Sequence, residues 1–434
     1  MKCFVIDGPV KLHGPVTVNG SKNAALPLLA AGLLTNSEVT LRQVPRLRDI
    51  RNMQTLLSEL GCSVSEGDAG ELKLKTSDET SSHARYDIVK TMRASICVLG
   101  PLLAKRGTAR VAMPGGCAIG TRPIDLHLRG LQALGAEVSL DSGDVIVKAE
   151  KLRGTTIFLG GPFGSTVLGT ANVMSAATLA EGVTVIESAA CEPEIVDLAR
   201  MLNAMGAGIT GAGTPRITIE GVKELHGADH IIMPDRIEAG TYILAAAITG
   251  GNIQVHNCPY DSLLALFDRL AGAGIEVKKS IPAESDSRCT VSVDGSACAG
   301  RVNPIRLTTQ PYPGFPTDLQ AQMMALLTLG RGNSIVTEKV FPERFLHVPE
   351  LTRMGAQLFR QGPTVVVSGV DHLVGAPVMA SDLRASASLV LAGMAAHGRT
   401  IVSRIYHLDR GYENMEDRLS ALGAQIQRAD DEDL

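Results

Sequence analysis

Two short patterns each occur six times in this chain of 434 residues, and they constrain its fold more than any other feature. The first pattern is a leucine, three residues and a glycine, followed by a short β-prone run, as in LSELGCSV, LQALGAEV and LSALGAQI. Each copy is typical of a helix that ends at a glycine and leads into a strand. The six glycines are Gly61, Gly135, Gly206, Gly274, Gly355 and Gly423.

The second pattern precedes each copy of the first. It is an apolar segment rich in small residues, then a turn and a strand, as in KNAALPLLAAGLLTNSEVTL and RASASLVLAGMAAHGRTIVSR. Because small side chains let helices approach closely, we expect these six helices to be buried. Chance recurrence would not interleave two patterns six times, so we predict six βαβ-type units that share their cores.

The length of the chain exceeds what one hydrophobic core usually supports, so we expect two α/β domains of three units each. A break between the third and fourth units falls near residues 231–235. We predict one domain over residues 22–233 and a second from residues 1–21 plus 234–434. The opening strand, within residues 2–19, should pair with the C-terminal half.

Composition excludes several classes of partner. The net charge of -4, the absence of tryptophan and the 3% of aromatic residues argue against nucleic acid as a partner. The most apolar run, residues 24–34, is too short to span a bilayer, which needs roughly 20 residues, so we expect no membrane partner. The eight cysteines lack zinc-site spacing, and no secretory leader is evident, so we expect reduced thiols and a cytoplasmic protein.

A glycine-rich stretch, PGGCAIGTRPIDLH, places Cys117 among glycines and five residues before Arg122. Glycines permit a mobile loop and a close approach of its backbone to a ligand. Arg122 and the loop amides would favour a thiolate or hold an anion beside it. Taken alone, the stretch fits a surface turn with a small buried residue at least as well.

Charged residues gather at the starts of the small-residue helices. They are Lys22, Arg93, Asp235, Asp318, Asp382 and Arg384, with Arg344 and Arg410 in later segments. A lysine at a helix start opposes the helix dipole, but together with the helix N-terminus it forms an anion site; a solvent-exposed lysine is the alternative. If the units are equivalent, the starts share one surface in each domain, and two such surfaces would form a cationic cleft. We therefore predict a small phosphorylated acid as ligand, without a defined reaction.

Nine runs in this order resemble the UDP-N-acetylglucosamine 1-carboxyvinyltransferase (MurA) family of enolpyruvyl transferases over nearly the whole chain. They are GSKNAALP, KTMRASI, PGGCAIGTRPIDLH, EPEIVD, MPDRIEAGT, YPGFPTDLQAQ, RFLHVPEL, DLRASASLVLAG and RIYHLDRGYE. The resemblance implies two inside-out α/β barrel domains, each of three repeats around buried helices, with the active site in the cleft between them.

The implied reaction transfers the enolpyruvyl group of phosphoenolpyruvate to the 3-hydroxyl of UDP-N-acetylglucosamine and releases phosphate, the first committed step of peptidoglycan synthesis. The implied partners are these two small molecules. The resemblance implies no metal and no organic cofactor, and we expect a monomer.

The resemblance also assigns roles to single residues. It implies that the phosphate of phosphoenolpyruvate is bound by Lys22, Arg122 and Arg410, and its carboxylate by Arg344 and Arg384. It implies that Asp318 is the base that accepts the proton of the sugar 3-hydroxyl. Cys117 is the implied acid that protonates C3 of phosphoenolpyruvate and can form a covalent adduct.

The remaining implied contacts hold the sugar nucleotide. They are Asn23, Arg93, Pro123, Ile124, Asp125, Leu126 and Val340, with Arg122 beginning the uridine segment. We expect Cys117, Asp318, Lys22 and Arg410 to be the catalytic residues.

One loop departs from the family pattern. Residues 160–169 read GGPFGSTVLG, without the lysine common in the family, and Thr166 stands where a serine is usual. Cys191 stands where arginine is common. These changes leave open a paralogue that acts on another nucleotide or alcohol. A binding protein that lost catalysis is a further alternative, but the presence of Cys117, Asp318 and the five cations argues against it.

Overall fold

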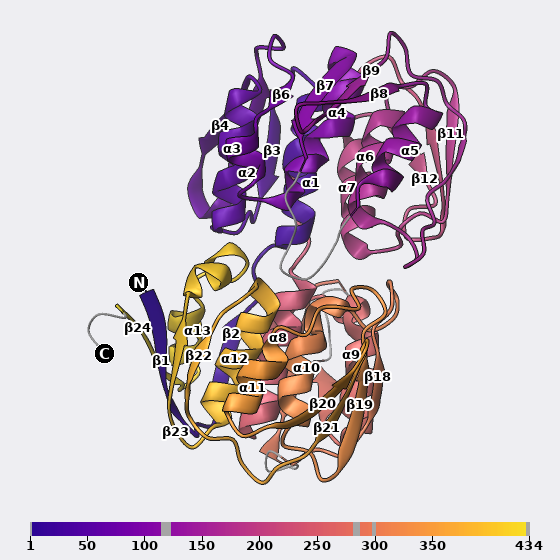
Figure 1. Ribbon diagram of the computed structural model, residues 1–434. Helices are drawn as coiled ribbons and strands as arrows, with labels where there is room; N and C mark the ends of the chain where they lie inside the picture. Colours follow the sequence, from indigo (N-terminus) through magenta and orange to yellow (C-terminus); the bar gives the residue numbers. More distant parts are fainter. Residues whose placement is uncertain (1, 114–122, 281–286, 297–300, 431–434) are drawn as a thin grey trace. The chain divides into compact units, whose positions relative to one another are not determined.

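The computed structural model describes residues 2–113, 123–280, 287–296 and 301–430, so Cys117 and Arg122 lie outside the described residues (Figure 1). The chain divides into two compact units. The first unit takes the described residues of 20–233, and the second takes residues 2–19 with those of 234–430. The sequence placed this boundary two residues later. Ser21 goes with the first unit, where its Oγ accepts the amide of Ala24 and caps the first helix.

The strands of the first unit form three four-stranded sheets, with the strand orders β14-β3-β5-β4, β6-β7-β9-β8 and β10-β11-β13-β12. In each sheet the first two strands are parallel and the other pairs are antiparallel. The strands are β3 (Val39–Arg42), β4 (Cys62–Glu66), β5 (Leu72–Thr76), β6 (His83–Ala84), β7 (Thr108–Ala112), β8 (Glu137–Asp141), β9 (Asp144–Lys148), β10 (Thr156–Phe158), β11 (Val183–Glu187), β12 (Gly208–Thr210), β13 (Arg216–Glu220) and β14 (Asp229–Ile231).

The second unit repeats this arrangement in sheets β16-β17-β15-β2, β18-β19-β21-β20 and β22-β23-β1-β24. Each of its sheets again contains one parallel pair, namely β2 with β15, β18 with β19 and β22 with β23. The strands are β1 (Lys2–Gly8), β2 (His13–Thr17), β15 (Asn252–Cys258), β16 (Glu276–Lys279), β17 (Cys289–Asp294), β18 (Arg306–Thr308), β19 (Asn333–Thr337), β20 (Gln357–Gln361), β21 (Thr364–Ser368), β22 (Pro377–Met379), β23 (Gly398–Ser403) and β24 (Gln425–Asp430).

The helices follow the predicted alternation. The first unit contains α1 (Lys22–Ala31), α2 (Arg48–Glu59), α3 (Tyr86–Val89), α4 (Leu99–Arg106), α5 (Asp125–Ala133), α6 (Val167–Ala177) and α7 (Pro193–Ala204). The second contains α8 (Arg236–Thr249), α9 (Leu264–Gly272), α10 (Gln320–Leu327), α11 (His347–Arg353), α12 (Leu383–Ala395) and α13 (Met415–Ala421). No helix of the described ranges combines the length and the apolar character that crossing a membrane requires.

The small-residue helices are buried, as predicted. Every residue of α8 and of α10 is buried, and in α12 the buried run extends from Arg384 to Met394. These three helices pack on one another and stand in the middle of the second unit, with the sheets around them (Figure 1). In the first unit α6 packs on both α1 and α4. Each unit has its own hydrophobic core, so the prediction of two inside-out α/β domains of three repeats is confirmed.

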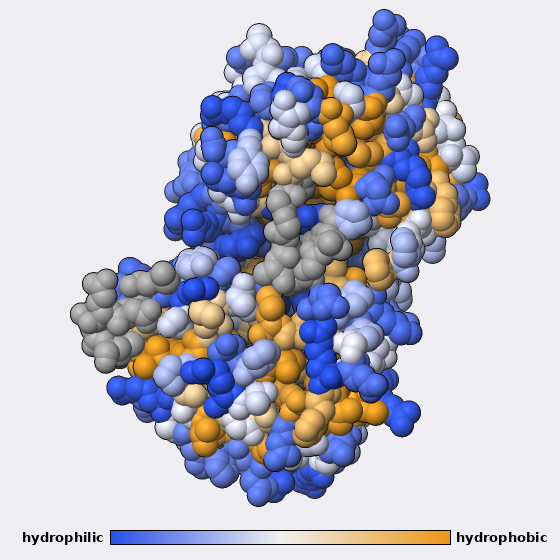
Figure 2. All heavy atoms as spheres, in the orientation of Figure 1, coloured by the Kyte–Doolittle hydropathy of each residue, from blue (hydrophilic) through white to orange (hydrophobic). Residues whose placement is uncertain are grey.

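Polar residues cover the outside of this arrangement. On the face drawn in Figure 2, hydrophilic side chains spread over the periphery of each unit, and apolar side chains show mainly toward the middle of each unit. Several large apolar side chains are exposed, some on strands, such as Leu140, Phe158 and Phe359, and others on helices, such as Leu264. Such exposure is ordinary for a folded surface.

Strands from distant parts of the chain close each ring of repeats. In the second unit the N-terminal strand β1 lies antiparallel between β23 and β24, and β2 pairs in parallel with β15. The prediction that the opening strand pairs with the C-terminal half is therefore confirmed. In the first unit β14 pairs in parallel with β3, and Asp197 accepts hydrogen bonds from His230 and from the Met233 amide.

The six recurring glycines all have positive φ, and each lies two residues after the last residue of a helix. Their φ angles run from 80° at Gly61 to 102° at Gly206. Each is followed by a strand, namely β4, β8, β12, β16, β20 or β24. The predicted helix–glycine–strand pattern is confirmed, because side chains other than hydrogen rarely tolerate this backbone conformation.

Alanine substitutions at two of these glycines should separate backbone strain from steric overlap. A Cβ at Gly61 would lie 1.9 Å from the carbonyl oxygen of Asp78, whereas a Cβ at Gly135 has its nearest neighbour 3.7 Å away. We expect Gly135→Ala to lower the free energy of unfolding by about 1–2 kcal/mol through φ alone. Gly61→Ala should lower it further. Urea unfolding measures both, and equal midpoints for the two variants would contradict the steric argument.

A buried carboxylate joins β2 to the start of α8. Glu238 is 3% exposed and accepts hydrogen bonds from the backbone amide of Asn19 at 2.7 Å and from its side chain at 3.2 Å. Burial raises the pKa of Glu238 to about 7, an effect that nearby Arg418 opposes and Asp235 reinforces. The folded protein therefore holds a proton on this group at pH values where the unfolded chain has lost it.

The stability contributed by this proton falls as the pH rises from the ordinary value of 4.5 toward about 7. We compare the free energy of unfolding of Glu238→Gln with that of the wild type at about pH 5 and at about pH 8. The variant should become more stable relative to the wild type as the pH rises, because glutamine has no charge to bury. Changes in hydrogen bonding contribute equally at both pH values. Thermal unfolding at the two pH values tests this, with the exposed Glu276→Gln as control. A difference that does not change with pH would contradict it.

Candidate active site

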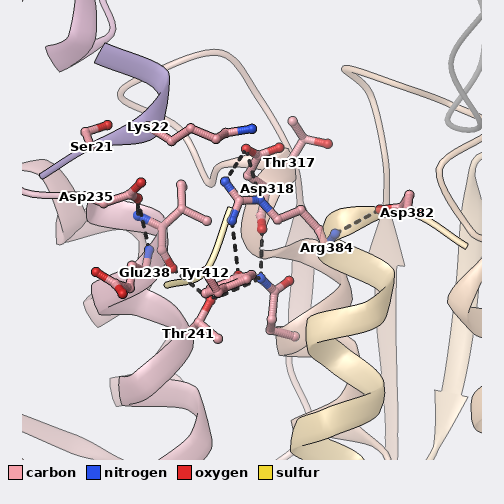
Figure 3. A network of polar contacts seen from close by, with 12 residues as sticks. Ser21, Lys22, Asp235, Glu238, Thr241, Thr317, Asp318, Asp382, Arg384 and Tyr412 are labelled. Atoms are coloured by element: carbon pink, nitrogen blue, oxygen red, sulfur yellow. Dashed lines mark hydrogen bonds and ion pairs between the residues drawn. The ribbon is translucent and has the colours of Figure 1, made fainter. Parts of the chain in front are cut away.

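Asp318 meets two arginines in the second unit, Arg344 and Arg384, and Figure 3 shows its contact with Arg384. It lies in the 3₁₀ helix Thr317–Leu319, which leads into α10. Its Oδ1 accepts Nη1 of Arg344 at 2.7 Å, and its Oδ2 accepts Nη2 and Nε of Arg384 at 3.2 and 3.3 Å. The Asp318 side chain is 26% exposed, whereas those of Arg344 and Arg384 are 8% and 2% exposed. The carboxylate is thus the accessible member of the cluster, with both cations behind it.

Arg384 is held by a buried polar network that the sequence did not predict. Its Nη1 donates to the hydroxyl of Tyr412 at 3.1 Å, and that hydroxyl also contacts Thr241 at 2.9 Å (Figure 3). Gln322 donates to the Tyr412 hydroxyl at 3.3 Å and to the carbonyl of Asp318 at 3.0 Å. Burial opposes the charge of Arg384, but the Tyr412 oxygen and Asp318 outweigh it and hold its pKa above the ordinary value. The guanidinium is therefore permanently charged and fixed in place.

Two other acidic residues at helix starts are helix caps. Asp235 accepts the amides of Ile237 and Glu238 at the start of α8. Asp382 accepts the amides of Arg384 and Ala385 at the start of α12. Helix capping is sufficient to explain why these two positions are acidic, and no ligand is needed to explain them.

The other second-unit residues that the sequence indicated lie on short segments. Arg410 ends the 3₁₀ helix Ile405–Arg410 and is half-buried, and the backbone amide of Val340 donates to Glu338 at 2.8 Å. His347 begins α11 and is buried. Burial lowers the pKa of His347 to about 4; the charge of Asp382 opposes this shift and that of Arg344 adds to it, so His347 is neutral near pH 7.

In the first unit, Lys22 begins α1 and is only 9% exposed. Its Nζ lies 3.3 Å from Oδ2 of Asp49, a buried residue in the first turn of α2. The alternative of a solvent-exposed lysine is therefore wrong. Asn23, the next residue of α1, is half-buried. A buried ammonium at a helix N-terminus suits an anion that can share it with Asp49.

Arg93 begins a 3₁₀ helix, Arg93–Val98, and lies close to His127 of α5. Burial, together with the charge of Arg93, lowers the pKa of His127 to about 4. Nδ2 of Asn172 donates to Nδ1 of His127 at 2.9 Å and to the carbonyl of Ile96 at 2.9 Å. His127 is therefore neutral, with its proton on Nε2.

The start of α5 carries the predicted uridine segment. Pro123 and Asp125 are exposed, Ile124 is buried and Leu126 is half-buried. A Cβ added to Gly161 would lie 3.1 Å from Cδ1 of Leu126, so the 160–169 loop packs directly on this segment.

Local structure explains some of the residues in the loop 160–169, which departs from the family pattern. Gly161 and Gly164 exchange backbone hydrogen bonds of 2.8 and 3.1 Å, which makes a tight turn. Thr166 caps α6 by accepting the amide of Gly169 at 3.2 Å. Cys191 is half-buried just before α7. The threonine is thus explained by capping, for which a hydroxyl is sufficient.

Of the predicted residues, the structure brings Asp318, Arg344 and Arg384 into direct contact and places Lys22 in a buried ion pair. Sequence reasoning missed the partners that hold them, above all Asp49 and Tyr412. Tyr412 is in the run YHLDRGY, and Asp49 is an acid in the first turn of an amphipathic helix, but neither pattern indicates its partner. Cys117 and Arg122 lie outside the described residues.

Comparisons with known proteins identify the family of this chain. The sequence model of the EPSP synthase (3-phosphoshikimate 1-carboxyvinyltransferase) family matches residues 6–419. A UDP-N-acetylglucosamine 1-carboxyvinyltransferase of Nitratidesulfovibrio vulgaris is 52% identical over 429 residues, which are 99% of each chain. Proteins of the same name from Dinoroseobacter shibae and Methylacidiphilum infernorum are 52% and 50% identical, again over 99% of each chain.

Solved structures share the fold at lower identity. The enolpyruvyl transferase NikO from Streptomyces tendae superposes with a TM-score of 0.88 at 24% identity, over 99% of both chains. EPSP synthase from Acinetobacter baumannii gives a TM-score of 0.75 at 16% identity, over 99% of this chain and 100% of that one. From the family match and the half-identical relatives, the chain belongs to the EPSP synthase family of carboxyvinyltransferases, together with the UDP-N-acetylglucosamine 1-carboxyvinyltransferases.

Proposed function

We propose that this protein transfers the enolpyruvyl group of phosphoenolpyruvate to the 3-hydroxyl of UDP-N-acetylglucosamine and releases phosphate. The observation that carries the proposal is the contact of one accessible carboxylate, Asp318, with two buried arginines, Arg344 and Arg384. Such a cluster combines a proton acceptor with two guanidinium groups that suit a carboxylate. Relatives at 50–52% identity carry the name of this activity.

Arg344 and Arg384 are proposed to bind the carboxylate of phosphoenolpyruvate. Their guanidinium groups now face Asp318, which shows that both reach one carboxylate at hydrogen-bond distance. A substrate carboxylate would share these donors with Asp318. Charge-assisted hydrogen bonds from arginine contribute about 1.5–3 kcal/mol each, enough to orient a small anion.

Lys22, Arg122 and Arg410 are proposed to bind the phosphate group and to stabilise it as it leaves. The buried ammonium of Lys22 at the start of α1 supports this role. Cations around a leaving phosphate act electrostatically and move no proton.

The sugar nucleotide is proposed to contact both units. In the first unit its ligands would be Asn23, Arg93 and the segment of Pro123, Ile124, Asp125 and Leu126, with Val340 from the second. The neutral, buried His127 supports the position of Arg93, because a protonated imidazole there would repel the guanidinium.

The chemistry needs one proton donor and one acceptor. In the proposed sequence Cys117 protonates C3 of phosphoenolpyruvate, and C2 gains positive character. Asp318 takes the proton of the sugar 3-hydroxyl, whose oxygen bonds to C2. The tetrahedral intermediate then loses phosphate from C2 and returns a proton from C3 to the Cys117 thiolate, which restores the double bond, and Asp318 gives its proton to the departing phosphate. General acid–base steps of this kind each contribute about 10²–10⁴ in rate.

This activity would place the protein at the first committed step of peptidoglycan synthesis, in the cytoplasm and as a monomer, without a metal or organic cofactor. A paralogue with a different acceptor is not favoured. The relatives at 50–52% identity are named for UDP-N-acetylglucosamine, and the unusual Thr166 serves as the cap of α6.

A phosphate-release assay tests the proposed activity directly. We expect purified protein to release phosphate from phosphoenolpyruvate only when UDP-N-acetylglucosamine is also present, because the sugar oxygen must add before phosphate leaves. A panel of other UDP-sugars and free nucleosides serves as the control for the acceptor. Equal or faster turnover with one of these would show that the acceptor is wrong, and phosphate release without any acceptor would show a hydrolase.

Replacement of the proposed base should slow turnover without loss of the fold. We expect Asp318→Asn to lower kcat by about 10²–10⁴, because an amide cannot accept the hydroxyl proton. The matched control is Asp7→Asn, which removes the carboxylate of an exposed ion pair with Arg399 in the same unit and should leave kcat unchanged. Steady-state kinetics compares the two, and a kcat for Asp318→Asn within a factor of about two of the wild type would exclude Asp318 as the base.

A further inference from the structure

A fully buried carboxylate lies next to the Asp318 cluster and has no part in the roles assigned above. Glu338 follows β19 and is 0% exposed. Its Oε1 accepts the Thr309 hydroxyl at 2.7 Å and the amides of Val340 and Phe341 at 2.8 and 2.9 Å. Its Oε2 accepts the Thr317 hydroxyl at 2.9 Å. A charge removed from water is tolerated only with such a set of donors.

The direction of the two hydroxyl bonds is set by other groups. The Thr309 oxygen accepts the amide of Lys339 at 3.0 Å, and the Thr317 oxygen accepts Nη1 of Arg344 at 3.0 Å. Each hydroxyl carries a single hydrogen, so both point that hydrogen at Glu338. The arrangement therefore fits the charged carboxylate and forms a chain from Glu338 through Thr317 to the guanidinium of Arg344.

A second path joins Glu338 to Arg344 through the backbone. The carboxylate fixes the amide of Phe341, and the carbonyl of Phe341 accepts the amide of Arg344 at 2.9 Å. The guanidinium of Arg344 also lies 5.9 Å from the centre of the Phe341 ring. Both ends of Arg344, its backbone and its guanidinium, are thus held with respect to one buried carboxylate.

We propose that Glu338 is a positioning residue, which sets the guanidinium of Arg344 through Thr317 for the carboxylate of the enolpyruvyl donor. The inference rests on the proposed function. Glu338 does not touch the substrate; it acts on Arg344, and on Asp318 next to Thr317. A rigid partner behind a binding arginine maintains affinity because little ordering is left to occur when the ligand binds.

A purely structural role is the competing explanation, since the same bonds tie β19 to the 3₁₀ helix Thr317–Leu319. The two roles differ in what a substitution changes. Loss of a structural contact lowers stability and leaves the KM of the remaining folded enzyme unchanged. Loss of positioning raises the KM for phosphoenolpyruvate selectively.

The test uses four variants. Glu338→Gln keeps the size of the side chain but removes the charge and one acceptor, and Thr317→Val removes the hydroxyl link to Arg344. Thr317→Ser is the conservative variant that retains the hydroxyl. The matched control is Thr328→Val, which removes a fully buried hydroxyl bonded to Ala325 just beyond the far end of α10.

We expect Glu338→Gln and Thr317→Val to raise the KM for phosphoenolpyruvate about tenfold, as for one lost hydrogen bond to a charged group. In Thr317→Val, which leaves the bond between Glu338 and the Val340 amide in place, the KM for UDP-N-acetylglucosamine should change much less. Thr317→Ser and Thr328→Val should keep the KM for phosphoenolpyruvate of the wild type. Equal loss of thermal stability in all variants, with the KM for phosphoenolpyruvate unchanged, would overturn the inference.

Calorimetric titration with phosphoenolpyruvate separates this inference from the proposed function. If the wild type binds phosphoenolpyruvate but releases no phosphate, the proposed reaction is wrong, and weaker binding by Glu338→Gln and Thr317→Val than by Thr328→Val would still support positioning. Equal binding by all variants, or no binding by the wild type, would overturn it.

Discussion

Each repeat carries a helix that it cannot bury alone, and the rest of the structure follows from this constraint. The helices α8, α10 and α12 bury nearly their whole surface against one another and against three sheets. Small side chains permit this close packing. Because these helices are apolar on all sides, two repeats would not cover them, and a third is needed. The same requirement explains why β1 and β14 come from the ends of their units: each completes a sheet that the local chain leaves one strand short.

Central burial also determines where chemistry can occur. A fully buried helix exposes only its ends, so functional side chains must lie in its first turn or in the segment before it. Lys22 and Arg384 occupy the first turns of α1 and α12, and Asp318 precedes α10. The cations are therefore partly withdrawn from water, which strengthens their interaction with anions and requires an internal counter-charge.

Those counter-charges explain the polar groups around the candidate site. Asp49 faces Lys22, while Asp318 and the hydroxyl of Tyr412 face Arg384. Glu338 balances the charge of Arg344 indirectly, because the hydroxyl of Thr317 bonds to both side chains. Each arginine of the cluster thus has a fixed partner on a different segment, so its position is set by tertiary packing and not by its own segment alone.

The sequence by itself determined the repeats, the six glycine-stopped helices, the buried small-residue helices and the return of the N-terminal strand, because these depend on local propensity and periodicity. It also indicated Asp318, Arg344 and Arg384, which belong to recognisable runs. Only the tertiary structure decided which charges meet. Glu338 lies in a run, VTEKVF, that has no distinguishing pattern, and its bond to Thr317 joins residues 21 positions apart. Both residues belong to the fifth repeat, but the segment before α10 and the segment after β19 meet only when that repeat has folded, and spacing along the chain does not encode the contact.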